Sequence, residues 1–95
     1  MEEILTVDMK RGTAIYLGYE LKLTPTELRI LAAILEHEDG VSSQELLDSL
    51  LGDRRITCGN IAVHVCNINK KARMIGGRSI VSDVPGRGYC IAEHL

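Results

Sequence analysis

The strongest constraint on the fold is the spacing of apolar residues between Thr57 and Ile75. At about 100° per residue, these side chains fall on a single stripe of a helix. The stripe consists of Ile61, Val65, Ile68, Ala72 and Ile75. The opposite side carries amides, small side chains and positive charge, without a carboxylate. The sequence therefore predicts an amphipathic helix over residues 57–75 whose apolar stripe faces a core.

The outer side of this helix has the chemistry of a surface that enters a nucleic-acid groove. Its residues are Gly59, Asn60, Val63, Cys66, Asn67, Lys70 and Met74, with Arg73 beside them. An asparagine can bond adenine N6 and N7 together in the major groove, while Lys70, Lys71 and Arg73 can neutralise phosphates. An ordinary solvated helix face is the commoner explanation of such a surface, so the rest of the chain has to decide.

Charge is divided unevenly along the chain. The net charge is −2, but residues 1–53 hold 4 Lys/Arg and 11 Asp/Glu, whereas residues 54–95 hold 7 and 2. Because physiological salt screens fields beyond roughly 8 Å, the basic half can attract phosphate locally despite the acidic half. Aromatic residues make up only 3% of the chain. This argues against single-strand binders, which stack bases on Phe, Tyr or Trp.

The length of 95 residues fits one domain with an aliphatic core. No apolar run reaches the roughly 20 residues that span a bilayer, and the acidic N-terminus lacks a signal-peptide pattern, so we expect a cytoplasmic protein. Cys58, Cys66 and Cys90 form no C-x-x-C pair, so we expect reduced thiols. We predict no metal site and no cofactor, since these cysteines and the histidines lack ligand spacing. No catalytic triad, Cys/His pair or carboxylate pair appears, so we predict no enzyme.

Residues 1–23 predict an antiparallel three-stranded sheet. Three short runs, 4–8, 13–17 and 20–23, are separated by turn signals at 10–12 and 18–19. Alternation in Ile15/Leu17 and Leu21/Leu23 predicts that these side chains form the buried face. The sheet is interpreted as scaffold, and contact with a partner protein is the alternative role.

Residues 24–75 predict a core of three helices, two of which begin with capping boxes. Thr24, Pro25 and Glu27 provide the N-cap, the proline of the first turn and the residue that closes the box. That helix is expected to end at 39–40, and a second box at 42–45 begins a short helix. The predicted inward residues are Leu28, Leu31, Ile34 and Leu35 in the first helix, and Leu46, Leu47 and Leu50 in the second. Thr57 is the expected N-cap of the third helix.

Residues 78–92 predict a β-hairpin. Period-2 alternation flanks Pro85-Gly86, which is turn chemistry, and Arg87 lies near the tip. A sheet, three helices and a hairpin in this order predict an α+β fold, a winged helix-turn-helix with an N-terminal three-stranded sheet and a C-terminal β-hairpin wing.

The chain resembles the DNA-binding effector domain of OmpR/PhoB-type bacterial response regulators over about residues 13–92. The matching segments are 23–28, Val41-Ser42 with Leu46-Leu47, Val63-His64-Val65 with Ile68 and Lys70-Lys71, and 85–89. The resemblance implies that the third helix enters the major groove of double-stranded DNA and the wing reaches the adjacent minor groove. It also implies that the 52–56 loop touches RNA polymerase and that two copies pair on repeated half-sites. The family's receiver domain, which carries a phosphorylatable Asp in two-component systems, has no counterpart in this sequence.

The family usually has arginines where Cys66, Asn67 and Asn69 stand here. Because arginine on guanine is the commonest specific contact, we expect weak guanine preference, and adenine read by Asn60 or Asn67. Fewer phosphate contacts also predict a shallow salt dependence. The predicted DNA contacts are Asn60, Val63, His64, Cys66, Asn67, Lys70, Lys71, Arg73 and Arg87.

Several of these residues have simpler interpretations. His64 is expected to be half-buried, packing or bonding a phosphate, and His37 to complement the dipole at the end of the first helix. Cys66 is either a redox-sensitive contact or a small packing residue, and Tyr89 is expected in the core of the wing. The alternative function is a winged-helix protein-interaction module that has lost strong DNA binding, since fold alone does not decide function.

Overall fold

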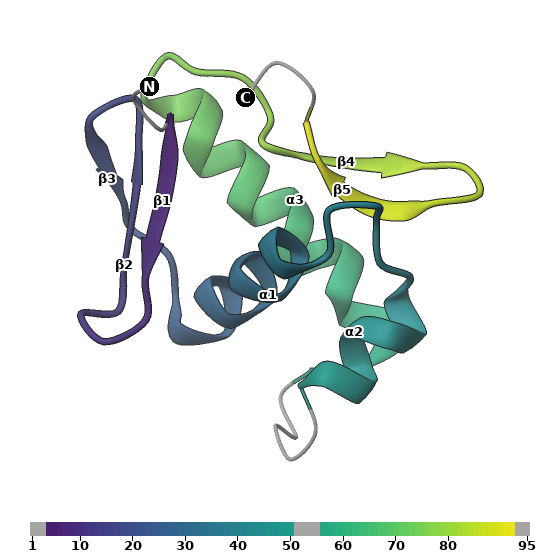
Figure 1. Ribbon diagram of the computed structural model, residues 1–95. Helices are drawn as coiled ribbons and strands as arrows, with labels where there is room; N and C mark the ends of the chain where they lie inside the picture. The colour runs from purple at the N-terminus through teal and green to yellow at the C-terminus, as the bar shows by residue number, and fades with distance from the viewer. Residues whose placement is uncertain (1–3, 51–55, 93–95) are drawn as a thin grey trace.

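The computed structural model describes residues 4–50 and 56–92. Three strands come first, three helices follow, and a two-stranded hairpin completes the described chain (Figure 1). The elements are β1 (Leu5–Asp8), β2 (Thr13–Tyr16), β3 (Tyr19–Leu21), α1 (Pro25–Glu36), α2 (Ser43–Ser49), α3 (Cys58–Met74), β4 (Val81–Val84) and β5 (Gly88–Ile91). This order confirms the predicted fold class, a winged helix-turn-helix preceded by a small antiparallel sheet.

The buried face of the N-terminal sheet differs from the prediction. Ala14 and Tyr16 are 0% and 2% exposed, whereas Ile15 is half-buried and Leu17 is 46% exposed. The prediction that Ile15 and Leu17 face the core is therefore wrong. Leu21 is buried and pairs with Ala14 in the ladder, so Ala14 lies on the same inward face of the sheet. Successive residues of a strand point to opposite faces, so Ile15 lies on the other face. Leu17 lies beyond the strand, in a turn with φ 54°.

Tyr16 points inward because it has a partner far along the chain. Its hydroxyl accepts a hydrogen bond from the Arg78 N–H at 3.1 Å and lies 3.3 Å from the Arg78 carbonyl oxygen, to which it donates. Its ring also packs where a side chain at Gly77 would stand. Tyr16 thus joins the N-terminal sheet to the segment between α3 and the wing.

The predicted capping boxes of α1 and α2 are both present. The Thr24 hydroxyl accepts from the Glu27 N–H at 3.2 Å while Glu27 Oε1 accepts from the Thr24 N–H at 3.0 Å, and Ser42 and Glu45 repeat this exchange. Helix α1 ends at Glu36, three residues before the predicted end. The C-cap is His37, whose Nδ1 lies 2.8 Å from the Ala33 carbonyl oxygen, at the helix end where the sequence predicts it.

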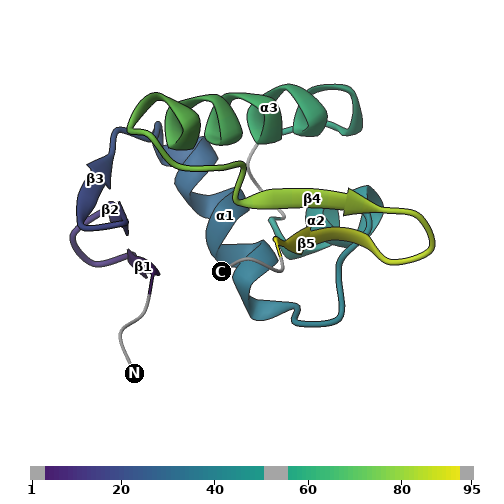
Figure 2. The same cartoon turned by 90° about the horizontal axis from the view of Figure 1, so that it is seen from above.

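The inward stripes of all three helices meet in one core. Leu28, Leu31 and Ile34 of α1 and Leu46 of α2 are buried, and Leu35 and Leu47 pack against them. The whole α3 stripe follows the prediction: Ile61, Val65, Ile68 and Ala72 are buried and Ile75 packs at the edge. Figure 2 shows α3 along one edge of the molecule, with α1 and the wing on the same side of it.

The wing is an antiparallel hairpin that is fastened to the loop between α1 and α2. Val81 pairs with Ile91 and Val84 with Gly88, and Tyr89 is buried as predicted. Val41 forms a β-bridge with Tyr89 through two backbone hydrogen bonds of 2.9 and 2.7 Å. A side chain at Gly88 would collide with the Val41 carbonyl, and Gly88 has φ 87°. Glycine is therefore required where the wing meets this loop.

The fold predicts a large loss of stability from truncation inside the core. We expect Ile68→Ala and Leu31→Ala each to lower the free energy of unfolding by about 2–5 kcal/mol, because both side chains are fully buried and a cavity would remain. Val63→Ala on the 56% exposed outer face is the matched control and should change it by at most about 0.5 kcal/mol. Urea unfolding followed by circular dichroism measures these differences. An unchanged midpoint for both core variants would contradict the core assignment.

Candidate nucleic-acid interface

Helix α3 presents an outer face that is open to solvent. Val63 and Met74 are 56% and 78% exposed, and Cys66, Lys70 and Arg73 are also exposed. Asn60, His64 and Asn67 are half-buried. The segment 58–74 contains no Asp or Glu, so this face carries amide, thiol, apolar and positively charged groups without a negative charge. The side chains therefore point outward as the helical spacing predicts.

The Asn60 amide is partly engaged at the start of α3. Its Oδ1 accepts a hydrogen bond from the Thr57 N–H at 2.8 Å. The oxygen thus satisfies one of the backbone N–H groups at the first turn of a helix, which have no partner within the helix. Asn67, the other asparagine predicted to read adenine, lies further along α3 and takes no part in this capping contact.

Lys71 lies on the side of α3 that faces α1, away from the outer face. Its Nζ donates to Glu27 Oε1 at 2.6 Å, and the Glu27 side chain is only 4% exposed. Since a buried carboxylate needs an opposite charge and hydrogen-bond donors, Lys71 serves as the counter-ion of Glu27. The Lys71 ammonium group, predicted to contact a phosphate, instead forms an ion pair that joins the first turn of α1 to the last turns of α3. The sequence predicts that Glu27 caps α1, but no local pattern indicates its ion pair with Lys71, 44 residues away.

Arg73 in the last turn of α3 and Arg87 on the wing are exposed, and each donates a hydrogen bond to a neighbouring segment. Arg73 Nη1 donates to Ser79 Oγ at 2.7 Å, and Arg87 Nε donates to the Asp39 carbonyl oxygen at 3.0 Å. A guanidinium has five N–H groups, so each of these bonds uses a single donor. Arg87 lies in the turn between β4 and β5, near the tip of the wing as predicted.

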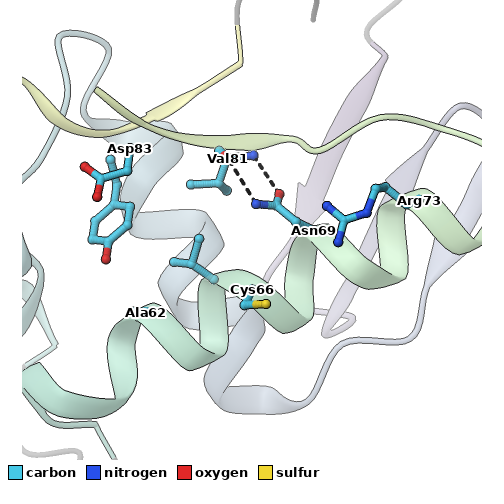
Figure 3. A pocket seen from close by; sticks show the side chains of 8 residues that line it. Ala62, Cys66, Asn69, Arg73, Val81 and Asp83 are labelled. Carbon is cyan, nitrogen blue, oxygen red and sulfur yellow. Dashed lines mark hydrogen bonds between the residues drawn. The ribbon is translucent and has the colours of Figure 1, made fainter. Parts of the chain in front are cut away.

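A hollow of about 300 Å³ lies between α3 and the wing (Figure 3). Its walls are Ala62, Val65, Cys66, Asn69, Arg73, Val81, Asp83 and Tyr89. Asn69 reaches across it: its Oδ1 accepts from the Ile80 and Val81 N–H groups, both at 2.9 Å, and its Nδ2 donates to the Val81 carbonyl at 3.0 Å. The sequence indicates Asn69 only as a position without the usual arginine, and its role between helix and wing comes from the tertiary structure.

Some predictions concern sites other than this face. Among residues 4–50 and 56–92, no three His, Cys, Asp or Glu side chains gather closely enough to hold a metal ion. In the same ranges, none of the helices combines the length and the apolar character that crossing a membrane requires. Cys66 is exposed and Cys90 is buried, and both are free thiols. Most of the 52–56 loop, which the resemblance assigns to RNA polymerase, lies outside the described residues.

Comparison with known proteins supplies the family. Residues 18–91 match the family described as "Transcriptional regulatory protein, C terminal". The chain belongs to that family. Its members are the C-terminal DNA-binding domains of OmpR/PhoB-type response regulators, so the predicted resemblance is confirmed.

Three relatives illustrate the family. The transcriptional activator protein PfeR of Pseudomonas aeruginosa is 30% identical over 92 residues, which cover 94% of this chain and 30% of PfeR. The transcriptional regulatory protein BaeR of Escherichia coli is 36% identical over 92 residues, covering 93% of this chain and 38% of BaeR. The chain therefore spans well under half the length of both. The crystal structure of the DNA-binding domain of CpxR from E. coli is 28% identical with a TM-score of 0.69, covering 93% of this chain and 89% of that one.

The ion pair predicts that two adjacent lysines differ in their effect on stability. We expect Lys71→Ala to lower the free energy of unfolding by about 1–3 kcal/mol, because the buried Glu27 carboxylate loses a charged donor. Lys70→Ala, with its exposed head group, is the matched control and should cost no more than about 0.5 kcal/mol. In a Glu27→Gln background the cost of Lys71→Ala should shrink, since no buried charge remains. Equal costs for the two lysines would contradict the structural role of Lys71.

Proposed function

We propose that this domain binds double-stranded DNA with sequence preference, as the effector domain of a bacterial transcription regulator. The observation that carries the proposal is the outer face of α3, which is exposed, lacks carboxylates and lies beside the wing. A major groove about 12 Å wide admits one α-helix. The wing, with Arg87 near its tip, would then reach the adjacent minor groove. Membership of the transcriptional regulatory family supports this assignment.

Base recognition is proposed for the middle of α3. Asn67 has the paired donor and acceptor that match adenine N7 and N6, and the exposed Val63 and Cys66 offer apolar contact for a thymine methyl group. No arginine stands among these positions, so guanine lacks its commonest partner. Target sites centred on A·T pairs fit this set of side chains best. His64, half-buried beside them, is proposed as a packing or phosphate contact.

Phosphate recognition is proposed for Lys70, Arg73 and Arg87. All three are exposed, and they come from the outer face of α3, its last turn and the wing. Lys71 is left out of this set because its ammonium group pairs with Glu27. Contact of the 52–56 loop with RNA polymerase and pairing of two copies on repeated half-sites are further proposals, which rest on the family alone.

Substitutions in the two sets should have different consequences for DNA. We expect Asn67→Ala to weaken binding to duplexes that the wild-type chain enriches from a randomised pool, with little effect on scrambled duplexes. Lys70→Ala and Arg87→Ala should weaken enriched and scrambled duplexes alike, because phosphates carry no sequence information. Fluorescence anisotropy on both duplex sets measures this. If the wild-type chain bound no duplex at low salt, the DNA proposal would fail and a protein-interaction module would take its place.

Salt dependence provides a separate test of the phosphate contacts. The logarithm of the binding constant should fall linearly with the logarithm of salt concentration, and the slope should be shallow because few cations lie on this face. We expect Lys70→Ala to reduce the magnitude of the slope by about 0.9, the contribution of one phosphate. Asn67→Ala is the control and should leave the slope unchanged. The same slope for the wild-type chain and Lys70→Ala would remove Lys70 from the phosphate set.

A further inference from the structure

The Asn69 side chain leaves α3 toward the wing, not toward the outer face (Figure 3). Its amide makes three hydrogen bonds to the backbone of two consecutive residues, Ile80 and Val81. Val81 begins β4, and on the other side this strand pairs with β5 through Ile91. The amide thus provides a donor and an acceptor to Val81 in the way that a neighbouring strand would.

These backbone groups depend on Asn69 because they are buried. Ile80 and Val81 are 0% and 4% exposed, and a buried N–H or carbonyl that loses its partner destabilises the folded state. An in-plane donor next to an acceptor is a property of the Asn and Gln side chains. An arginine at this position would have donors but no acceptor, so it could not make the two bonds that Oδ1 accepts here.

Apolar and polar contacts both join α3 to the wing, because Val65 and Ile68 of α3 belong to the same buried core as Val81 and Tyr89 of the wing. The hollow of about 300 Å³ lies there, and Ala62 and Cys66 are the small side chains that α3 directs toward it. The hollow is open to solvent, so the side chains of α3 and the wing do not meet across it. The Asn69 hydrogen bonds add a directional constraint that apolar packing lacks, and they act on the distance and angle between helix and strand.

The wing has a second attachment at its other strand. Tyr89 of β5 exchanges two backbone hydrogen bonds with Val41, and Arg87 bonds the Asp39 carbonyl. These contacts hold the wing to the loop between α1 and α2, and they do not involve α3. Without Asn69, β4 would lose these hydrogen bonds to α3 and keep its apolar contacts with the core, so the start of β4 could shift relative to the helix while the bridge to Val41 holds β5.

We propose that Asn69 is a positioning residue that sets the distance and angle between α3 and the wing. It thereby fixes the spacing between Asn67 on the helix and Arg87 on the wing, so that both engage one duplex. This inference rests on the proposed DNA binding. It assigns to Asn69 an effect on DNA that passes through the wing and involves no contact between Asn69 and a base or phosphate.

A double-mutant cycle on DNA affinity tests this role. In the wild-type background, Arg87→Ala weakens binding to an enriched duplex, as stated above. In the Asn69→Ala background the wing is misplaced, so Arg87→Ala should have a smaller effect, with a coupling of about threefold or more. The control cycle pairs Asn67→Ala with Asn69→Ala, and it should be additive within about twofold, because the Asn69 hydrogen bonds go to the wing and Asn67 keeps its place on α3 when the wing moves.

Amide hydrogen exchange of the unbound chain gives a readout that needs no DNA. In Asn69→Ala the N–H groups of Ile80 and Val81 should lose protection, while Tyr89, bonded to Val41, keeps it. If Asn69→Ala does not fold, Asn69→Gln replaces it in the double-mutant cycle, because its longer amide keeps both hydrogen-bonding groups but displaces β4; in this variant the Ile80 and Val81 N–H groups should keep their protection.

Each outcome of these measurements decides one question. Loss of duplex binding by the wild-type chain would overturn the proposed function together with this inference. Binding by the wild-type chain, with the same effect of Arg87→Ala in both backgrounds, would overturn the positioning role and leave the proposed function standing. A coupled cycle together with selective loss of protection at Ile80 and Val81 would establish it.

Discussion

Burial of one stripe of α3 is the constraint on which the rest of the structure depends. Ile61, Ile68 and Ala72 have no exposed surface, and each helical residue turns the side-chain direction by about 100°. A rotation of α3 by one residue would therefore expose part of this stripe and bury the polar side. The core thus determines which side chains point outward, and the exposed Val63, Cys66 and Lys70 follow from packing on the far side of the helix.

Polar side chains complete what apolar packing leaves open. Tyr16 bonds both backbone groups of Arg78, Asn69 bonds the start of β4, and the Glu27–Lys71 pair joins α1 to α3. Each link connects segments that lie far apart in the sequence. All three act near the ends of α3 or on the segment that follows it, so the helix is oriented by hydrogen bonds as well as by its core stripe. The proposed DNA-binding face is therefore already ordered in the unbound chain.

Local signals in the sequence were sufficient for much of this structure. The capping boxes at Thr24 and Ser42 predict the starts of α1 and α2, and the period of the α3 stripe predicts its buried face. Prediction fails where a distant partner decides. Apolar character alone places Ile15 on the inward face of β2. Tyr16 takes that face instead, because its hydroxyl bonds Arg78 and its ring packs against Gly77.

The candidate site divides in the same way. The sequence by itself determined that α3 has an outer face with Asn67, Lys70 and no carboxylate, because helical periodicity needs only neighbouring residues. Only the tertiary structure decided that Lys71 neutralises Glu27 and that Asn69 holds the wing. The residue type alone does not show whether a lysine or an asparagine is exposed for a partner or bonded within the fold. Which of these roles each takes depends on groups that the folded chain brings within hydrogen-bond distance.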